Sequence, residues 1–283
     1  MTLYRSRRHS WQQLDASRAT KLTDARLQLH HAAQLVAAMG ISYLPKADDD
    51  SHTNMEWLAG ALASNVVGER PFRVAVRPSP FALAVIVGDA ELASLPLHGR
   101  TIADGARWIQ VQVRTLGVDP QQFTLAKHYT IPAHPVARGV PFDTTDDAAF
   151  EQLQRWYGNA DALLRRLAAE RGGSSVRCWP HHFDIATLLS PMTGTSIGVG
   201  LEPGDGSYDE PYWYVNLYPA PHDAGALTAS ALEGNGTWHT DQWLGAVLPG
   251  SRLAQEQQEA QISSFLESGI VACETQLRRD SGG

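Results

Sequence analysis

The sequence predicts an α+β protein, with a mainly antiparallel sheet and helices packed on one side of it. Strand-like segments come in consecutive runs, whereas single strands that alternate with helices would indicate a parallel sheet. Turns rich in Gly and Pro separate neighbouring strand-like segments and favour hairpins. A chain of 283 residues forms one large domain or two average ones. We therefore expect a single compact unit over residues 1–283, or two similar halves in close contact, near 1–143 and 144–283.

Hydrophobic periodicity and capping residues predict the elements of the first half. They are helices over residues 22–39, 53–66 and 101–117, a hairpin with strands over 72–76 and 81–87, and a strand over 122–131. The second and third helices are expected to begin at capping-box pairs, Thr53 with Glu56 and Thr101 with Asp104.

The second half is expected to contain one long helix, a run of strands and a closing helix. The helices cover residues 145–169 and 253–276, and the strands cover 176–189, 196–202, 212–218 and about 238–247. In the strand over 212–218, alternation places Trp213, Val215 and Leu217 on a face that joins the core. The opposite face is either the wall of a ligand pocket or a helix contact, and it carries Tyr212, Tyr214 and Tyr218.

Composition and missing motifs exclude several classes of function. The net charge of −7 argues against binding to a phosphate backbone, so no nucleic-acid partner is expected. The longest apolar stretch, Phe81–Val87, has only the length of a strand, so no membrane span is expected. Phosphate-binding loops and a nucleophile elbow are missing. The two cysteines, Cys178 and Cys273, form no CxxC motif and predict reduced thiols in a cytoplasmic protein.

The segment Cys178–Asp184 has the densest chemistry in the chain. On a strand, His182 and Asp184 would share one face, and His239 follows after 54 intervening residues. This spacing resembles the two-histidine, one-carboxylate triad of the iron- and 2-oxoglutarate-dependent oxygenases, in which Arg252 would match the arginine that binds the cosubstrate. It predicts a mononuclear site for iron, zinc or manganese with His182, Asp184 and His239 as ligands. That fold needs several strands between the triad's two halves, and only two are predicted.

A small-molecule ligand is the expected partner. Tyr212, Tyr214, Asp205 and Arg252 are the candidate residues to bind it, and the sequence assigns neither a catalytic residue nor an oligomeric state. The alternative function is a non-catalytic binding or structural protein whose histidines are satisfied internally. The acidic residues between 202 and 210 are expected to form a solvated turn, since they lack the spacing of a calcium loop.

Two longer segments resemble bacterial proteins grouped as a domain-of-unknown-function family. They are WPHHFDIATLL at Trp179–Leu189 and SIGVGLEPGDGSYDEPYWYVNLYPAP at Ser196–Pro221. The shared pattern is a Phe-Asp pair, a Pro-Gly-Asp turn and an aromatic strand before a Pro-rich run. The resemblance implies no activity. Because Asp184 and Asp205 match the pattern, whereas the positions of His181 and His182 need not be histidine, it favours a pocket centred on carboxylates.

Overall fold

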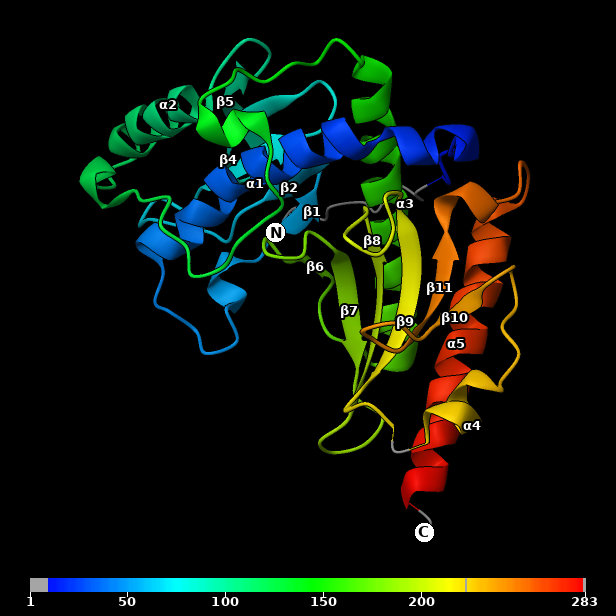
Figure 1. The fold of residues 1–283 in the computed structure, drawn as a ribbon. Helices are drawn as coiled ribbons and strands as arrows, with labels where there is room; N and C mark the ends of the chain where they lie inside the picture. The colour runs from blue at the N-terminus through cyan, green and yellow to red at the C-terminus, as the bar shows by residue number, and fades with distance from the viewer. Residues whose placement is uncertain (1–9, 222, 282–283) are drawn as a thin grey trace.

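The computed structural model describes residues 10–221 and 223–281, and within them the chain is an α+β protein with two antiparallel sheets (Figure 1). The first sheet has the strand order β1-β2-β3-β4-β5. Its strands are β1 (Glu56–Leu58), β2 (Ala61–Ala63), β3 (Arg73–Arg77), β4 (Ala82–Val87) and β5 (Ala90–Pro96). The helices of this half are α1 (Thr23–Tyr43) and α2 (Ile102–Thr115).

The second sheet has the order β10-β11-β9-β8-β7-β6. Its strands are β6 (Arg177–Cys178), β7 (Ile185–Leu189), β8 (Ser196–Glu202), β9 (Tyr212–Tyr218), β10 (Thr237–His239) and β11 (Gly245–Pro249). Three α-helices accompany it: α3 (Asp147–Arg171), α4 (Ala224–Thr228) and α5 (Gln258–Ser281). Short 3-10 helices occur at η1 (Ala16–Lys21), η2 (Ser51–Thr53), η3 (Pro120–Gln122), η4 (Pro135–Arg138) and η5 (Gly250–Arg252).

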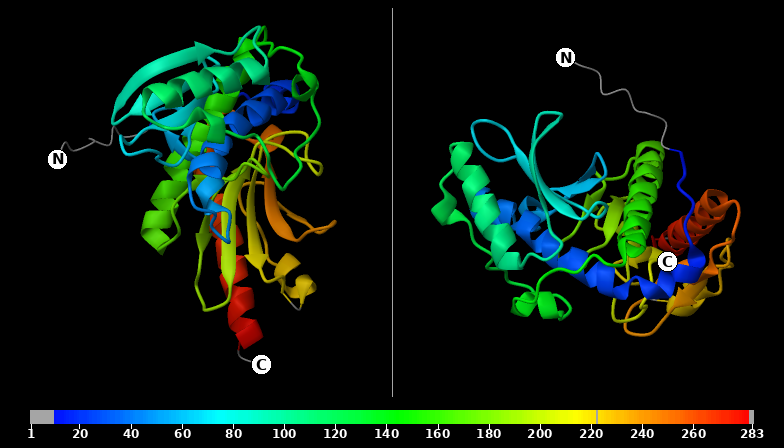
Figure 2. Two further views of the ribbon diagram at one scale, coloured as in Figure 1. Left: turned by 90° about the vertical axis from the view of Figure 1, so that its left-hand side faces the viewer. Right: turned by 90° about the horizontal axis from the view of Figure 1, so that it is seen from above.

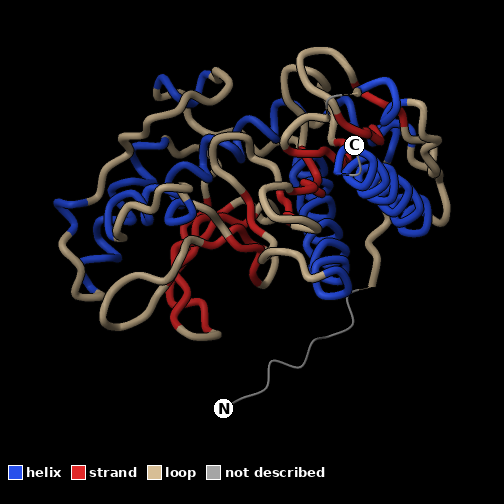
Figure 3. The backbone as a smooth tube through the Cα atoms, turned by 90° about the horizontal axis from the view of Figure 1, so that it is seen from below, coloured by secondary structure: helices blue, strands red, loops and turns tan. Residues whose placement is uncertain are grey.

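The helices connect the two sheets and cover one face of the second. Helix α1 packs on β3 and extends to the loop that joins β8 and β9, which lies below its N-terminal half in Figure 1. Helices α3 and α5 lie side by side, as the views in Figures 2 and 3 show, and ion pairs join them. These pairs link Arg166 to Glu259, and Arg171 to both Glu267 and Glu274. No helix in the described part of the chain is long and apolar enough to cross a bilayer.

The second sheet has one apolar and one polar face. Trp213, Val215 and Leu217 are buried on the side of α3 and α5, which confirms the predicted core face of β9. The opposite side, called the tyrosine face here, carries alternate residues of β8 and β9. They are Gly198, Gly200, Glu202, Tyr212, Tyr214, Asn216 and Tyr218. One continuous hydrophobic cluster includes side chains from both sheets and from α1, α3 and α5.

The segment over residues 53–66 forms a hairpin, so the helix predicted there is wrong. Between β1 and β2, Ala59 and Gly60 have φ angles of 48° and 82°. Two consecutive residues with positive φ form a tight turn that suits a hairpin and cannot continue a right-handed helix. Glu56 pairs with Ala63 across the hairpin instead of capping a helix.

Other boundaries also differ from the prediction. Residues 122–131 lie in η3 and an irregular loop, and residues 238–247 split into the hairpin of β10 and β11. Strand β5 was not predicted because most of its residues are exposed at a sheet edge. Gly40 lies within α1 instead of ending it, and the backbone of His52 packs directly against this position, where a Cβ atom would not fit. Helix α2 does begin with the predicted capping box of Thr101 and Asp104.

Candidate functional site

The WPHHFD segment forms the loop of a tight hairpin, so the single strand predicted over 176–189 is wrong. Cys178 in β6 pairs with Ile185 in β7. Within the loop, the Trp179 N–H donates to the Asp184 carbonyl at 3.0 Å, and the Phe183 N–H donates to the Trp179 carbonyl at 2.7 Å. His182 lies in the turn and not on a strand face.

The loop is held by contacts around Phe183. This residue has a φ of 77°, which is rare for a bulky side chain and persists only where packing enforces it. Its ring stacks on His30 of α1 at 4.4 Å between centroids, and its carbonyl accepts a 2.7 Å hydrogen bond from the Tyr157 hydroxyl. His30 Nε2 lies 2.8 Å from the Pro180 carbonyl, which also accepts from Gln34 Nε2. Burial lowers the pKa of His30 to about 3, so the ring is neutral and donates this bond.

These contacts place Asp184 beside Glu202. The register pairs Ile185 with Leu201, and one step further along the antiparallel ladder brings Asp184 opposite Glu202. The two side chains, called the carboxyl pair here, are 9% and 5% exposed. Among the described residues, Asp184 Oδ1 and Glu202 Oε1 are buried and have no hydrogen-bond partner. Burial raises the pKa of both carboxyl groups, most strongly that of Glu202, so the pair favours a protonated form.

Tyr214 reaches Asp184 across the bare backbone of Gly200. Its hydroxyl donates a 2.6 Å hydrogen bond to Asp184 Oδ2, although β8 lies between β9, which carries Tyr214, and β7, which Asp184 precedes. A Cβ atom at Gly200 would lie 2.7 Å from Tyr214 Oη and 2.8 Å from the Ile185 carbonyl oxygen. Because both distances are far below van der Waals contact, only glycine allows this crossing.

A second acid is bound next to the pair. The Tyr212 hydroxyl donates to Asp205 Oδ2 at 2.8 Å, and Asp205 Oδ1 accepts from the backbone N–H groups of Ser207 and Tyr208. The hydroxyl of Tyr208 lies 3.0 Å from His239 Nδ1. Asp205 is therefore satisfied by hydrogen bonds, in contrast to the carboxyl pair.

The rings of five residues form a continuous row, called the aromatic row here. In order they are Tyr214, Tyr212, Tyr208, His239 and Trp243. Successive centroids lie 6.4, 4.8, 5.5 and 4.4 Å apart. All but the buried Tyr212 are half-buried, so the row is partly accessible from outside.

Arg26 of α1 is the buried cation nearest to these acids. Its guanidinium donates to the Gly204 carbonyl and forms a 3.3 Å ion pair with Asp209. Its charge opposes the effect of burial on Glu202, whose pKa nevertheless remains raised. Arg26 therefore supports the β8–β9 loop and only partly compensates the acids.

The structure brings together most of the residues that the sequence indicated. Asp184, Asp205, Tyr212 and Tyr214 are linked in pairs by hydrogen bonds, and His239 joins them through the aromatic row. Arg252 lies away from the pair, where it donates to Thr237 Oγ1 at 3.3 Å.

Two residues of the site were not predicted. Glu202 was expected to belong to a solvated turn, although strict alternation in SIGVGLE already places it on the face of Gly198 and Gly200. No sequence pattern indicated that Arg26 belongs to the site, because only the packing of α1 brings it to the β8–β9 loop.

The predicted metal ligands do not form one site. In the part of the chain that the structure describes, no group of three or more His, Cys, Asp and Glu side chains is placed to hold a metal ion. His182 is exposed in the hairpin loop, and Asp184 is bonded to Tyr214. The His239 ring is bonded to Tyr208 and, through Nε2, to the Asp241 carbonyl at 2.5 Å. The hairpin removes the shared strand face on which the metal prediction depended.

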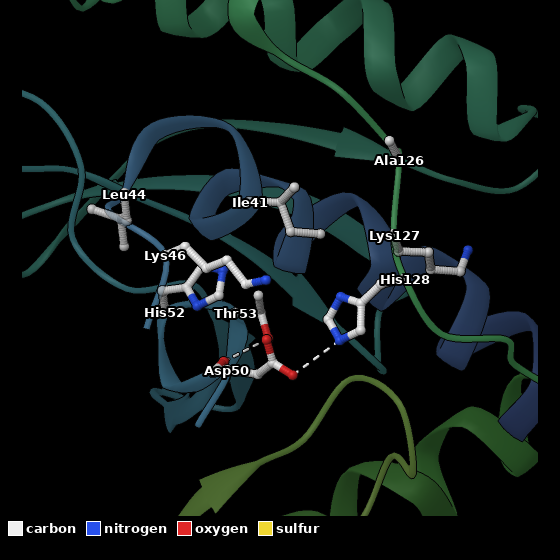
Figure 4. A pocket seen from close by; sticks show the side chains of 9 residues that line it. All are labelled: Ile41, Leu44, Lys46, Asp50, His52, Thr53, Ala126, Lys127 and His128. Atoms are coloured by element: carbon white, nitrogen blue, oxygen red, sulfur yellow. Dashed lines mark hydrogen bonds and ion pairs between the residues drawn. The ribbon is translucent and has the colours of Figure 1, made fainter. Parts of the chain in front are cut away.

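A cavity of about 320 Å³ lies elsewhere, between the end of α1 and residues 126–128 (Figure 4). His128 and Asp50 point toward each other and lie 3.0 Å apart, and Lys46 and Lys127 also line the cavity, which therefore carries more basic than acidic groups. It contains none of the buried, unpartnered polar atoms found in the described residues. The carboxyl pair is therefore the stronger candidate site.

Comparisons of the chain with known protein families, with curated proteins and with solved structures found no match. The resemblance to a domain-of-unknown-function family therefore stays a prediction.

Proposed function

We propose that the chain binds a small molecule on its tyrosine face, at the carboxyl pair. The observation that carries this proposal is that Asp184 and Glu202 each keep a buried oxygen without a partner, beside a partly accessible row of aromatic rings. A buried polar atom without a hydrogen bond costs folding free energy, and folded proteins contain few of them. Two such atoms, one at the end of β8 and one in the loop just before β7, are readily explained by a ligand that supplies the missing donors.

The surroundings of the pair support a binding role over a purely structural one. Buried carboxyl oxygens without a partner cost folding free energy, a cost that apolar side chains of similar size would avoid. The site has two further features. Gly200 has no side chain, which lets Tyr214 reach Asp184, and Phe183 adopts an unfavourable positive φ in the turn that positions Asp184. Both buried cysteines are free, which supports the proposed cytoplasmic location.

Ligand-observed NMR with a library of common metabolites tests this function. We expect compounds that bind the wild-type chain and lose binding in the double variant Asp184→Asn/Glu202→Gln. The control is Asp241→Asn, which replaces a single carboxyl group by an amide at an exposed position beside His239. If every compound that binds does so equally well to the double variant, or if none binds, the proposal is wrong.

Acid–base catalysis at the same site is a second candidate function. Two neighbouring carboxyl groups with raised pKa values are a common arrangement in enzymes that transfer protons near neutral pH. A bound compound that is chemically converted by the wild type, and not by Glu202→Gln, would show this activity. The metal-dependent enzyme that the sequence suggested stays a prediction, and residues 10–221 and 223–281 contain no group of three side chains placed to hold its metal.

A further inference from the structure

The site carries more negative than positive charge when its acids are ionised. Asp184, Glu202 and Asp205 lie around Tyr212 and Tyr214, and each raises the pKa of at least one of these hydroxyls. The nearby buried cation, Arg26, already binds Asp209 and a backbone carbonyl. Burial raises the pKa of Asp184 and His182 lowers it, but the His182 side chain is exposed in the loop. Among the described residues, neither acid of the carboxyl pair forms an ion pair, so Arg26 and His182 compensate the ionised pair only in part.

The unpartnered atoms of the pair are all acceptors when the acids are ionised. Asp184 Oδ1 and Glu202 Oε1 both need a donor, and Tyr214 supplies one only to Asp184 Oδ2. An ammonium group has three donors and a guanidinium has five, with no acceptor on either. A carboxylate or phosphate ligand would instead add a third negative charge to the pair.

Aromatic rings flank the carboxyl pair on the same face. Tyr214 contacts Asp184 directly, and the ring of Tyr212 follows at 6.4 Å between centroids. The faces of tyrosine and tryptophan rings attract cations within about 6 Å, by roughly 0.5–2 kcal/mol depending on desolvation. Carboxylates beside aromatic faces are the combination that recognises organic cations in proteins.

We propose that the ligand of this site is a small organic cation whose ammonium or guanidinium group binds between Asp184 and Glu202. This inference rests on the proposed function and specifies its ligand class. On binding, a proton held by the pair leaves to solvent and the positive group takes its place, with no covalent bond formed or broken in the ligand. The Tyr214 side chain turns outward to admit it, since its ring covers the pair through Gly200.

Titration of the full chain with four compounds that each carry a short unbranched alkyl chain tests this proposal. The probes are n-butylammonium, n-butylguanidinium, n-butanol and butyrate, followed by NMR chemical shifts of the protein. We expect only the two cations to bind. Their affinity should rise up to tenfold per pH unit as the pH increases through the titration of the pair, because each cation displaces a proton.

Variants connect the binding to the pair. Glu202→Gln and Asp184→Asn should each weaken binding of the cations at least tenfold, and the exposed control Asp241→Asn should change it less than twofold. Glu202→Gln keeps the Tyr214–Asp184 hydrogen bond, so it is informative even if Asp184→Asn unfolds the chain.

The outcomes separate this inference from the proposed function. If n-butanol or butyrate binds as tightly as the cations and needs Glu202, the cation inference is wrong and a small-molecule site remains. If the cations bind Glu202→Gln as well as they bind wild type, they bind elsewhere and the inference is wrong. Failure of all four probes overturns the cation inference, whereas the proposed function fails only if the metabolite library also yields no ligand dependent on the pair.

Discussion

Replacing Gly200 by alanine tests whether Tyr214 crosses β8 as the structure indicates. The new methyl carbon would lie 2.7 Å from Cζ and Oη of Tyr214 and 2.8 Å from the Ile185 carbonyl oxygen. The tyrosine ring can move away, but the Ile185 carbonyl belongs to the paired strand β7 and can move only if the ladder shifts. We therefore expect the Tyr214–Asp184 hydrogen bond to break.

The expected loss of stability follows from three contributions. Forcing an extra methyl group into a packed site costs about 1–3 kcal/mol. Loss of the buried hydrogen bond costs about 0.5–1.5 kcal/mol more. Alanine reduces the conformational entropy of the unfolded chain, which offsets about 0.4–1 kcal/mol of this loss. The free energy of unfolding should therefore fall by roughly 0.5–4 kcal/mol.

Urea unfolding followed by tryptophan fluorescence measures this change. Gly206→Ala is the matched control, because a Cβ there meets no atom within 4 Å and the residue does not need a positive φ. The control should keep or slightly increase wild-type stability. If Gly200→Ala is as stable as Gly206→Ala, Tyr214 does not lie across β8 and the described site geometry is wrong.

Three further predictions concern the surroundings of the site. Because burial raises the pKa of Glu202, the folded chain holds its proton more tightly than the unfolded chain, so the contribution of Glu202 to stability should fall as the pH rises above about 4.5. Buried His30, with its lowered pKa, contributes the opposite slope, so the measurement is the difference between wild type and Glu202→Gln in urea titrations at successive pH values: wild type should lose stability relative to the variant as the pH rises, and a constant difference would contradict the raised pKa. Cys178 and Cys273 should react with a maleimide only after unfolding, since both thiols are buried with raised pKa values; labelling of native protein within minutes would contradict this. Tyr157→Phe should lower the free energy of unfolding by about 1–3 kcal/mol, because the buried Phe183 carbonyl then loses the hydroxyl that donates to it at 2.7 Å. An unchanged urea midpoint would show that this hydrogen bond does not stabilise the fold.

Local patterns predicted the elements whose stability depends on their own residues. Strands β8 and β9 have the boundaries that alternation indicated, and the capping box of Thr101 and Asp104 begins α2. The same kind of pattern failed at Thr53 and Glu56, because pairing between β1 and β2 outweighed the helix cap. Capping energies are about 1 kcal/mol, so a strand partner that buries apolar surface can override them.

The candidate site shows which features the sequence alone predicts and which it does not. The chain by itself determined that Tyr212 and Tyr214 share a face and that Asp184 and Asp205 belong to the chemically important segments, because side-chain alternation is a local property of a strand. Only the tertiary structure decided that Asp184 lies beside Glu202, since antiparallel register joins positions far apart in the chain. In the described residues it also leaves the predicted metal ligands ungrouped: packing of Phe183 on His30 stabilises a left-handed turn that no local preference favours, and that turn converts the expected strand into a hairpin.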